Sequence, residues 1–163
     1  MGYITYENLG FYDLSVSTFK QSIERGKKLA VDERRMNLSD TYSWLSRVYY
    51  KQKAYDEIFA TLQEGYETTN SKYLLRRYAA YSFHIGGEDQ IKKGIEALDT
   101  LVDLPKSEDS FRNPDQPREA IYLLYAKAYW KLKNESESRK YLNMALEINP
   151  NNESALEFQK SIQ

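Results

Sequence analysis

Cysteine is absent from the 163-residue chain, which excludes disulfides and thiolate metal sites. No apolar run approaches the roughly 18 residues that a membrane-spanning helix needs. Basic residues number 23 and acidic residues 24, so the net charge of −1 gives no overall attraction to nucleic acid or to an anionic membrane. The first ten residues contain no basic region followed by an apolar one, and a cytoplasmic location is therefore expected.

The usual signatures of catalysis are also missing. The sequence contains no G-x-x-x-x-G-K-[ST] loop, no G-x-S-x-G elbow and no H-E-x-x-H helix. His84 is the only histidine, and no second histidine, cysteine or acidic cluster lies near it at the spacing of metal ligands. We therefore predict that the chain is not an enzyme and has no catalytic, cofactor or metal site.

Tyrosine, in contrast, is abundant, with 15 residues against 6 phenylalanines. Its large ring with a polar tip suits half-buried helix faces. The clearest pattern lies in residues 119–152, where large and small residues alternate at helical spacing and indicate two antiparallel helices in close contact. The pattern consists of Tyr122, Tyr125, Ala126, Tyr129, Ser138, Leu142, Ala145 and Pro150.

This pattern resembles the tetratricopeptide repeat, a helix–turn–helix unit of about 34 residues with large, small and proline residues at these positions. Weaker copies resemble it in residues 39–72 and 73–106, and a partial copy resembles it in residues 1–30. The resemblance implies an all-α fold in which antiparallel helix pairs stack into a right-handed superhelix, an α-solenoid.

A single solenoid over residues 1–163 is the expected domain organisation. Ser39 is the expected N-cap of the second repeat, and the helix before it is expected to continue past Ala30 as far as Arg35. The expected segments are a partial first repeat (1–36), a second repeat (39–72), a third repeat (73–104), a proline-containing loop (105–118), a fourth repeat (119–152) and a capping helix (153–163).

The third repeat fits the pattern least well. Ala80 lies 34 residues after Ser46, which predicts that Ala80 takes the small position of the first helix. Gly94 then matches the small position of the second helix only if about two residues are inserted before it. In the partial first repeat, Ser15 and Ser22 are expected at the small packing positions of a second helix.

The resemblance also implies a concave groove, lined mainly by the first helix of each pair, that binds peptides or protein segments. None of the residues carried over to this groove is acidic, so we expect a basic and aromatic groove that receives an acidic or carboxylate-bearing segment. The alternative interpretation is that some of these side chains are only solvated charges and that Trp130 packs on the neighbouring repeat. The groove residues are Ser43, Arg47, Tyr50, Lys51, Arg77, Tyr81, His84, Leu123, Lys127, Trp130 and Lys131.

Three functional classes remain open at this point. The first is a non-catalytic scaffold that binds a protein or peptide partner, without a cofactor. The second is a self-associating assembly module, in which end repeats or the proline loop contact another copy. The third is a helical repeat that binds nucleic acid, which the neutral net charge disfavours, so no nucleic-acid partner is expected.

Overall fold

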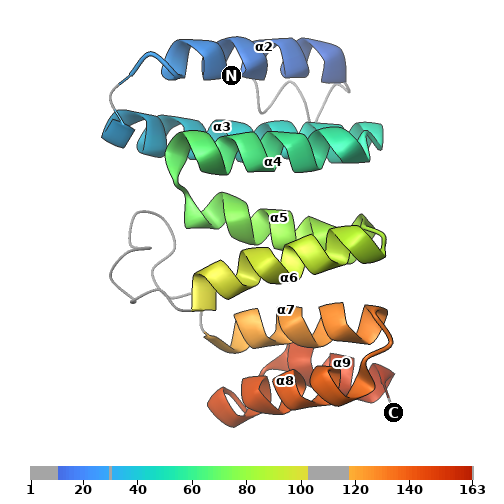
Figure 1. The fold of residues 1–163 in the computed structure, drawn as a ribbon. Helices are drawn as coiled ribbons and strands as arrows, with labels where there is room; N and C mark the ends of the chain where they lie inside the picture. Colours follow the sequence, from blue (N-terminus) through green and yellow to red (C-terminus); the bar gives the residue numbers. More distant parts are fainter. Residues whose placement is uncertain (1–10, 30, 103–117, 163) are drawn as a thin grey trace. The chain divides into compact units, whose positions relative to one another are not determined.

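All regular elements in the described part of the chain are α-helices (Figure 1). None of these helices combines the length and the apolar character that crossing a lipid bilayer requires. The first ten residues of the predicted partial first repeat and most of the predicted proline loop lie outside the described residues. The computed structural model describes residues 11–29, 31–102 and 118–162, with the backbone alone described over residues 31–37.

Packing divides the chain into two compact units, Met1–Tyr78 and Ala79–Gln163, and their boundary falls inside one helix. Unit 1 contains α2 (Tyr12–Gly26), α3 (Val31–Gln52), α4 (Tyr55–Thr69) and the first half of α5 (Lys72–Ile85). Unit 2 contains the end of α5, α6 (Glu88–Val102), α7 (Arg118–Lys131), α8 (Glu135–Ile148) and α9 (Glu153–Ser161).

In unit 1, α3 packs against both α2 and α4 (Figure 1). The approach of α4 depends on Gly65, because a Cβ atom there would lie 2.7 Å from both Cγ of Tyr42 and Cδ1 of Leu74. Ile58 and Leu62 of α4 are completely buried. Large residues on α3 and small residues on α4 therefore interlock, as the repeat pattern predicts.

In unit 2, α7 and α8 form the helix pair whose sequence fits the repeat pattern best, and α9 packs on α8. The close approach is visible where the Ser138 hydroxyl donates a 2.8 Å hydrogen bond to the Ala126 carbonyl. Asn152 caps α9 by accepting from the Ala155 amide at 3.0 Å, and Ala155 joins the buried cluster of α7 and α8. The predicted all-α fold of packed helix pairs is confirmed.

The predicted start of the second repeat at Ser39 is wrong. Helix α3 begins at Val31 and continues through Ser39 to Gln52, and α2 already ends at Gly26. No proline or glycine lies between Val31 and Ser39 to stop the helix. Ser39 is buried inside α3, so its hydroxyl does not mark a helix N-terminus.

The predicted register of the third repeat is also wrong. Ala80 is exposed, whereas Ser82 is completely buried. A Cβ atom on Gly94 would lie 2.7 Å from Cβ of Ser82, so these two residues mark the close approach of α5 and α6. Twelve positions separate Ser82 from Gly94, as they separate Ala126 from Ser138. No residues are inserted between Ser82 and Gly94; the two extra residues lie between Ser46 and Ser82.

The face of α2 differs from expectation in a similar way. Ser15 is buried as predicted, but Ser22 is exposed and the neighbouring Ile23 is buried. Gly26 is buried too, because a Cβ atom there would collide with the side chain of Leu38 on α3. Contact with α3 thus selects a face that includes Ile23 and Gly26 in place of Ser22.

Candidate functional site

Predicted groove residues come together in unit 1, where α3 and α5 face each other. The hydroxyl groups of Ser43 and Tyr73 lie 3.0 Å apart, and Nη1 of Arg77 donates to the Tyr73 hydroxyl at 3.4 Å. The guanidinium of Arg47 lies 4.6 Å from the ring centroid of Trp44. We call Ser43, Trp44, Arg47, Tyr73, Arg76 and Arg77 the basic–aromatic surface.

The electrostatics of this surface are evident at Tyr73. Burial of its phenol favours the neutral form and acts to raise the pKa. The hydrogen bond to Ser43 and the charges of Arg77 and Arg76 act in the opposite direction, and the net pKa of Tyr73 is lowered. Both guanidinium carbons lie 5.7 Å from the Tyr73 ring centroid. The surface therefore favours negative charge at this point.

Tyr50 and Lys51 complete the predicted groove residues of α3. Tyr50 is half-buried, and its ring centroid lies 6.4 Å from that of Tyr55 at the start of α4. Lys51 is exposed in the last turn of α3. These residues lie one turn beyond Arg47, so they extend the basic–aromatic surface along α3.

Four residues that bear on this surface are absent from the predicted groove set: Asp40, Trp44, Tyr73 and Arg76. Trp44 and Arg47 are three positions apart on α3, which is the spacing that brings helical neighbours into contact. Tyr73 precedes Arg76 and Arg77 by three and four positions and could have been found in the same way. Asp40 lies three positions before Ser43, so a half-buried carboxylate shares this side of α3.

Among the predicted residues of unit 2, Tyr81 is half-buried and His84 is exposed at the end of α5. Nζ of Lys131, at the end of α7, donates to the backbone carbonyl of His84 at 3.1 Å. His84 and Lys131 therefore lie next to each other in unit 2.

The predicted groove residues of α7 are largely engaged by α9. Leu123 is only 7% exposed and belongs to the buried cluster that includes Ala155 and Ile162. Trp130 packs against the same cluster, which belongs to its own helix pair and to α9 and not to the neighbouring repeat of the alternative interpretation. The ammonium group of Lys127 lies 5.9 Å from the ring centroid of Phe158. Helix α9 therefore covers side chains of α7 that a bound partner would otherwise contact.

With the corrected register of α5, the groove positions of this helix fall on buried residues. With Ser82 at the small position, the residues equivalent to Ser43 and Arg47 are Ala79 and Phe83, and both are buried. Equivalence between repeats therefore does not place Arg77 in the site. Its contact with Tyr73 does, and this contact lies entirely within unit 1.

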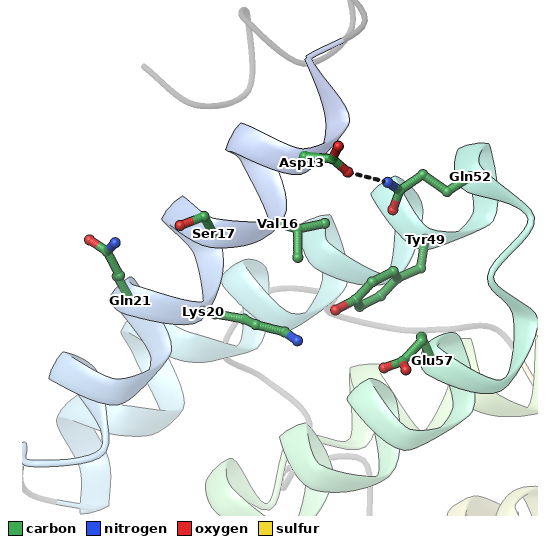
Figure 2. A pocket seen from close by; sticks show the side chains of 8 residues that line it. All are labelled: Asp13, Val16, Ser17, Lys20, Gln21, Tyr49, Gln52 and Glu57. Atoms are coloured by element: carbon green, nitrogen blue, oxygen red, sulfur yellow. Dashed lines mark hydrogen bonds between the residues drawn. The ribbon is translucent and has the colours of Figure 1, made fainter.

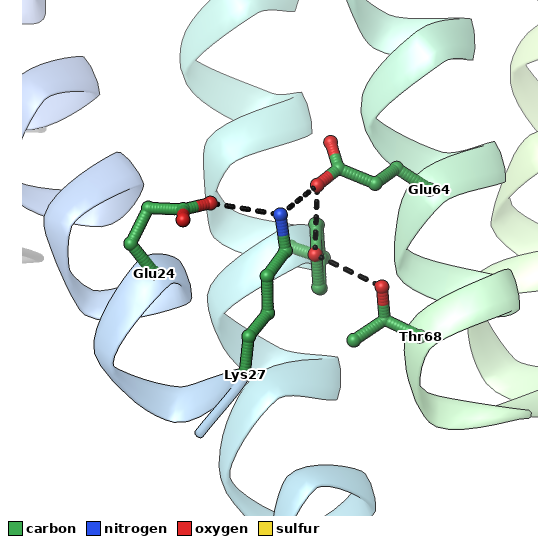
Figure 3. Close-up of polar contacts among 5 residues, drawn as sticks. Glu24, Lys27, Glu64 and Thr68 are labelled. Atoms are coloured by element: carbon green, nitrogen blue, oxygen red, sulfur yellow. Dashed lines mark hydrogen bonds and ion pairs between the residues drawn. The ribbon is translucent and has the colours of Figure 1, made fainter. Parts of the chain in front are cut away.

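A second polar cluster of unit 1 connects three helices (Figure 3). Nζ of Lys27 lies 2.8 Å from Oε1 of Glu24 and 2.7 Å from Oε1 of Glu64, and these contacts raise its pKa. The Tyr42 hydroxyl donates to the same Glu64 oxygen at 3.2 Å and lies 3.3 Å from the Thr68 hydroxyl. Every charge here has a partner, so the cluster holds helices together and is not a candidate binding site.

Residues 118–163 match the family model described as the Fis1 C-terminal tetratricopeptide repeat. The match covers α7, α8 and α9, the part of the chain in which the repeat pattern is clearest. No match was found among curated proteins.

Proposed function

We propose that this chain, which is a tetratricopeptide-repeat protein, acts as a scaffold that binds an acidic segment of a partner protein on the basic–aromatic surface. The tetratricopeptide repeat is generally a non-enzymatic fold for protein interaction. The observation that carries the proposal is the contact of Tyr73 with both Ser43 and Arg77, beside the Arg47–Trp44 pair.

The chemistry of these side chains suits carboxylates. A guanidinium group donates two parallel hydrogen bonds to a carboxylate, and it loses less freedom on binding when an aromatic ring already orients it. Arg47 is held over Trp44, and Arg76 and Arg77 lie beside Tyr73. Tyrosine and tryptophan also provide rigid apolar contact area for the rest of the segment.

The test measures binding of a fluorescein-labelled peptide rich in glutamate and aspartate to the whole chain and to the variant Arg47→Gln, Arg77→Gln. We expect about tenfold weaker binding by the variant, because two charge-assisted contacts are lost at a partly solvated surface. The matched control is Lys28→Gln, which removes an exposed cation from the turn after α2 and is expected to leave affinity unchanged.

Two outcomes would contradict the proposal. One is equal affinity for the double variant and the Lys28→Gln control. The other is equal or tighter binding of a labelled single-stranded RNA of the same charge, which would favour a nucleic-acid-binding repeat. Thermal unfolding of each variant, followed by circular dichroism, checks that a loss of binding does not come from a loss of fold.

Self-association is the second candidate function, and one observation favours it. The side chains of Phe11 and Leu14, at the start of α2, are 55% and 61% exposed. Exposed apolar residues of this size that lie together are typical of contact surfaces. Sedimentation equilibrium of the chain and of Leu14→Ser tests this: a concentration-dependent mass that the substitution lowers would support self-association.

A further inference from the structure

The basic–aromatic surface has more hydrogen-bond donors than acceptors where Ser43, Tyr73 and Arg77 meet. A guanidinium group can only donate, so the Tyr73 oxygen accepts from Nη1 of Arg77 at 3.4 Å. Ser43 and Tyr73 each have a hydroxyl hydrogen, and one of these forms the 3.0 Å hydrogen bond that joins the two residues. The other hydroxyl hydrogen therefore remains for a further acceptor.

The remaining hydrogen belongs to Tyr73 when Ser43 donates in the bond between them, and two observations favour this direction. Ser43 is only 5% exposed, whereas Tyr73 is half-buried, so an incoming group can reach the phenol more easily than the serine. The hydrogen bond with Ser43 also acts to lower the pKa of Tyr73, as a bond donated to the phenol oxygen does. The Tyr73 hydroxyl then keeps its own hydrogen for a ligand.

The described residues provide no carboxylate that accepts a hydrogen bond from Ser43 or Tyr73. Asp40 is half-buried on this side of α3, and α5 contains no acidic residue. Against the single carboxylate of Asp40 stand the three guanidinium groups that lie over the rings of Trp44 and Tyr73. Positive charge is therefore in excess around the available hydrogen, which favours an ionised acceptor.

Two other tyrosines show which acceptor a phenol finds in this fold. The Tyr42 hydroxyl donates to Oε1 of Glu64 at 3.2 Å, and the Tyr125 hydroxyl donates to Oδ1 of Asp99 at 2.6 Å. Hydrogen bonds to an ionised oxygen are stronger than those to a neutral one. Tyr73 has a hydroxyl and a guanidinium beside it in place of such a carboxylate.

In the open cleft of unit 1, where α2, α3 and α4 meet, donors and acceptors pair with each other (Figure 2). Nε2 of Gln52 donates to Oδ1 of Asp13 at 3.0 Å. A hydrogen bond to Tyr49 and the nearby Glu57 carboxylate raise the pKa of Lys20. The cleft therefore supplies its own acceptors, whereas the basic–aromatic surface leaves one donor without an acceptor.

We propose that Tyr73 selects a carboxylate side chain over the corresponding amide when an acidic segment binds to this surface. This role of Tyr73 rests on the proposed function. The Tyr73 hydroxyl donates its hydrogen to one carboxylate oxygen, and the guanidinium groups beside it donate to the other. Glutamine and asparagine have nearly the same shape as the acids, but an NH2 group replaces one oxygen and would direct donors at donors.

The test is isothermal titration calorimetry of the whole chain with an unlabelled peptide rich in glutamate and aspartate. The peptide is acetylated and amidated, so that every carboxylate belongs to a side chain, and in further peptides one acidic residue at a time is replaced by its amide. For at least one position, we expect the amide to weaken binding about tenfold in the native chain and only about twofold in Tyr73→Phe. A preference that Tyr73→Phe leaves unchanged at every position would overturn the proposal.

Two further variants separate the hydroxyl of Tyr73 from its surroundings. Ser43→Ala leaves the Tyr73 hydrogen available, so the preference for the acid over the amide should remain. Tyr12→Phe removes the hydroxyl of a half-buried tyrosine on α2 and is the matched control, with an unchanged preference expected. Loss of the preference in Ser43→Ala with retention in Tyr73→Phe, or equal loss in Tyr12→Phe, would refute the assignment to Tyr73.

Failure of this proposal can be distinguished from failure of the proposed function. Undiminished peptide binding by the Arg47→Gln, Arg77→Gln variant would refute the proposed function. Weaker binding by that variant, together with a full preference in Tyr73→Phe, would refute only the role of Tyr73. Because the preference is a ratio of two affinities measured on one variant, a uniform loss of folded protein leaves it unchanged.

Discussion

The junction of α2, α3 and α4 in unit 1 and the junction of α6, α7 and α8 in unit 2 have the same helical framework and different contents. In unit 2, Tyr141 stacks on Tyr125 and Tyr129, and the Tyr125 hydroxyl donates to Oδ1 of Asp99 at 2.6 Å. In unit 1, Tyr49 stands beside an open cleft that a lysine and two carboxylates border.

The difference shows how a repeat can be specialised without a change of backbone. Small buried residues recur at equivalent positions in both units, as Ser15 of α2 and Gly94 of α6, and Gly65 of α4 and Ala145 of α8, illustrate. Side-chain size differs at other positions: Tyr141 of α8 stacks on two tyrosine rings, whereas the equivalent residue of α4 is Thr61, which is buried. Stacked tyrosine rings are expected to add to the stability of unit 2, whereas unit 1 has an open cleft between α2, α3 and α4.

The two tryptophans allow each unit to be followed separately, because Trp44 lies in unit 1 and Trp130 in unit 2. Fluorescence of a Trp44→Phe background reports on unit 2, and fluorescence of a Trp130→Phe background reports on unit 1. Urea unfolding in these two backgrounds gives a free energy of unfolding for each unit.

The largest effect is expected for Tyr141→Ala, which would open the junction in unit 2. Loss of a half-buried ring that stacks on two others should lower the free energy of unfolding by about 2–4 kcal/mol. The equivalent change in unit 1, Thr61→Ala, removes far less contact area and should cost about 1 kcal/mol. Equal losses, measured by urea unfolding of the respective units, would show that the tyrosine cluster adds nothing to stability.

A smaller effect is expected for Tyr125→Phe, which keeps the ring and removes its hydrogen bond to Asp99. Hydrogen bonds to charged groups contribute about 1.5–3 kcal/mol, so a loss near 2 kcal/mol is expected in urea unfolding. Asp99→Asn and the double variant complete a thermodynamic cycle. Strict additivity of the two single losses would indicate that this contact carries no coupling energy.

Alkaline pH should destabilise unit 2 more than unit 1. Burial, and for Tyr125 also the contact with Asp99, raise the pKa of Tyr125 and of Tyr129 above the ordinary value of 10.0. Above pH 10 the unfolded chain loses these protons first, so folding stability falls as pH rises. Among the described residues of unit 1, the pKa of Tyr42 is raised and the pKa of Tyr73 is lowered, and their effects oppose each other.

The measurement is urea unfolding of the two tryptophan backgrounds between pH 8 and pH 11. We expect the urea concentration at the unfolding midpoint to fall more steeply above pH 10 for unit 2 than for unit 1. The Tyr125→Phe substitution should make this fall with pH less steep. Parallel decreases in the two units would contradict the assignment of the raised pKa values to a structural difference between them.

The smallest effect is expected for Lys27→Gln, which breaks the ion pairs of Figure 3. The side chains of Lys27 and Glu64 are 35% and 51% exposed, and exposed ion pairs contribute about 0–1 kcal/mol. The loss of unfolding free energy in unit 1 should shrink further in about 1 M NaCl, because salt screens exposed charges. A loss that is independent of salt would indicate a packing contribution of the lysine stem.

Particular residues show which features could be predicted from the sequence. In the fourth repeat, Ala126 and Ser138 were placed correctly because both helices follow the repeat spacing without insertion. In the third repeat, the choice of Ala80 over Ser82 was wrong because both are small, and spacing from Ser46 alone could not reveal two extra residues between Ser46 and Ser82. Arg77 was predicted for the site, yet Tyr73, which contacts it, was not.

The sequence by itself determined the helix pairs, because the spacing of large and small residues follows the helical period and depends only on neighbours along the chain. Tertiary structure decided the register between helices, the burial of Leu123 and Trp130 beside α9, and the contrast between an open and a filled junction. These features depend on which side chains from distant segments share one volume, and a pattern within a single helix carries no information about that volume.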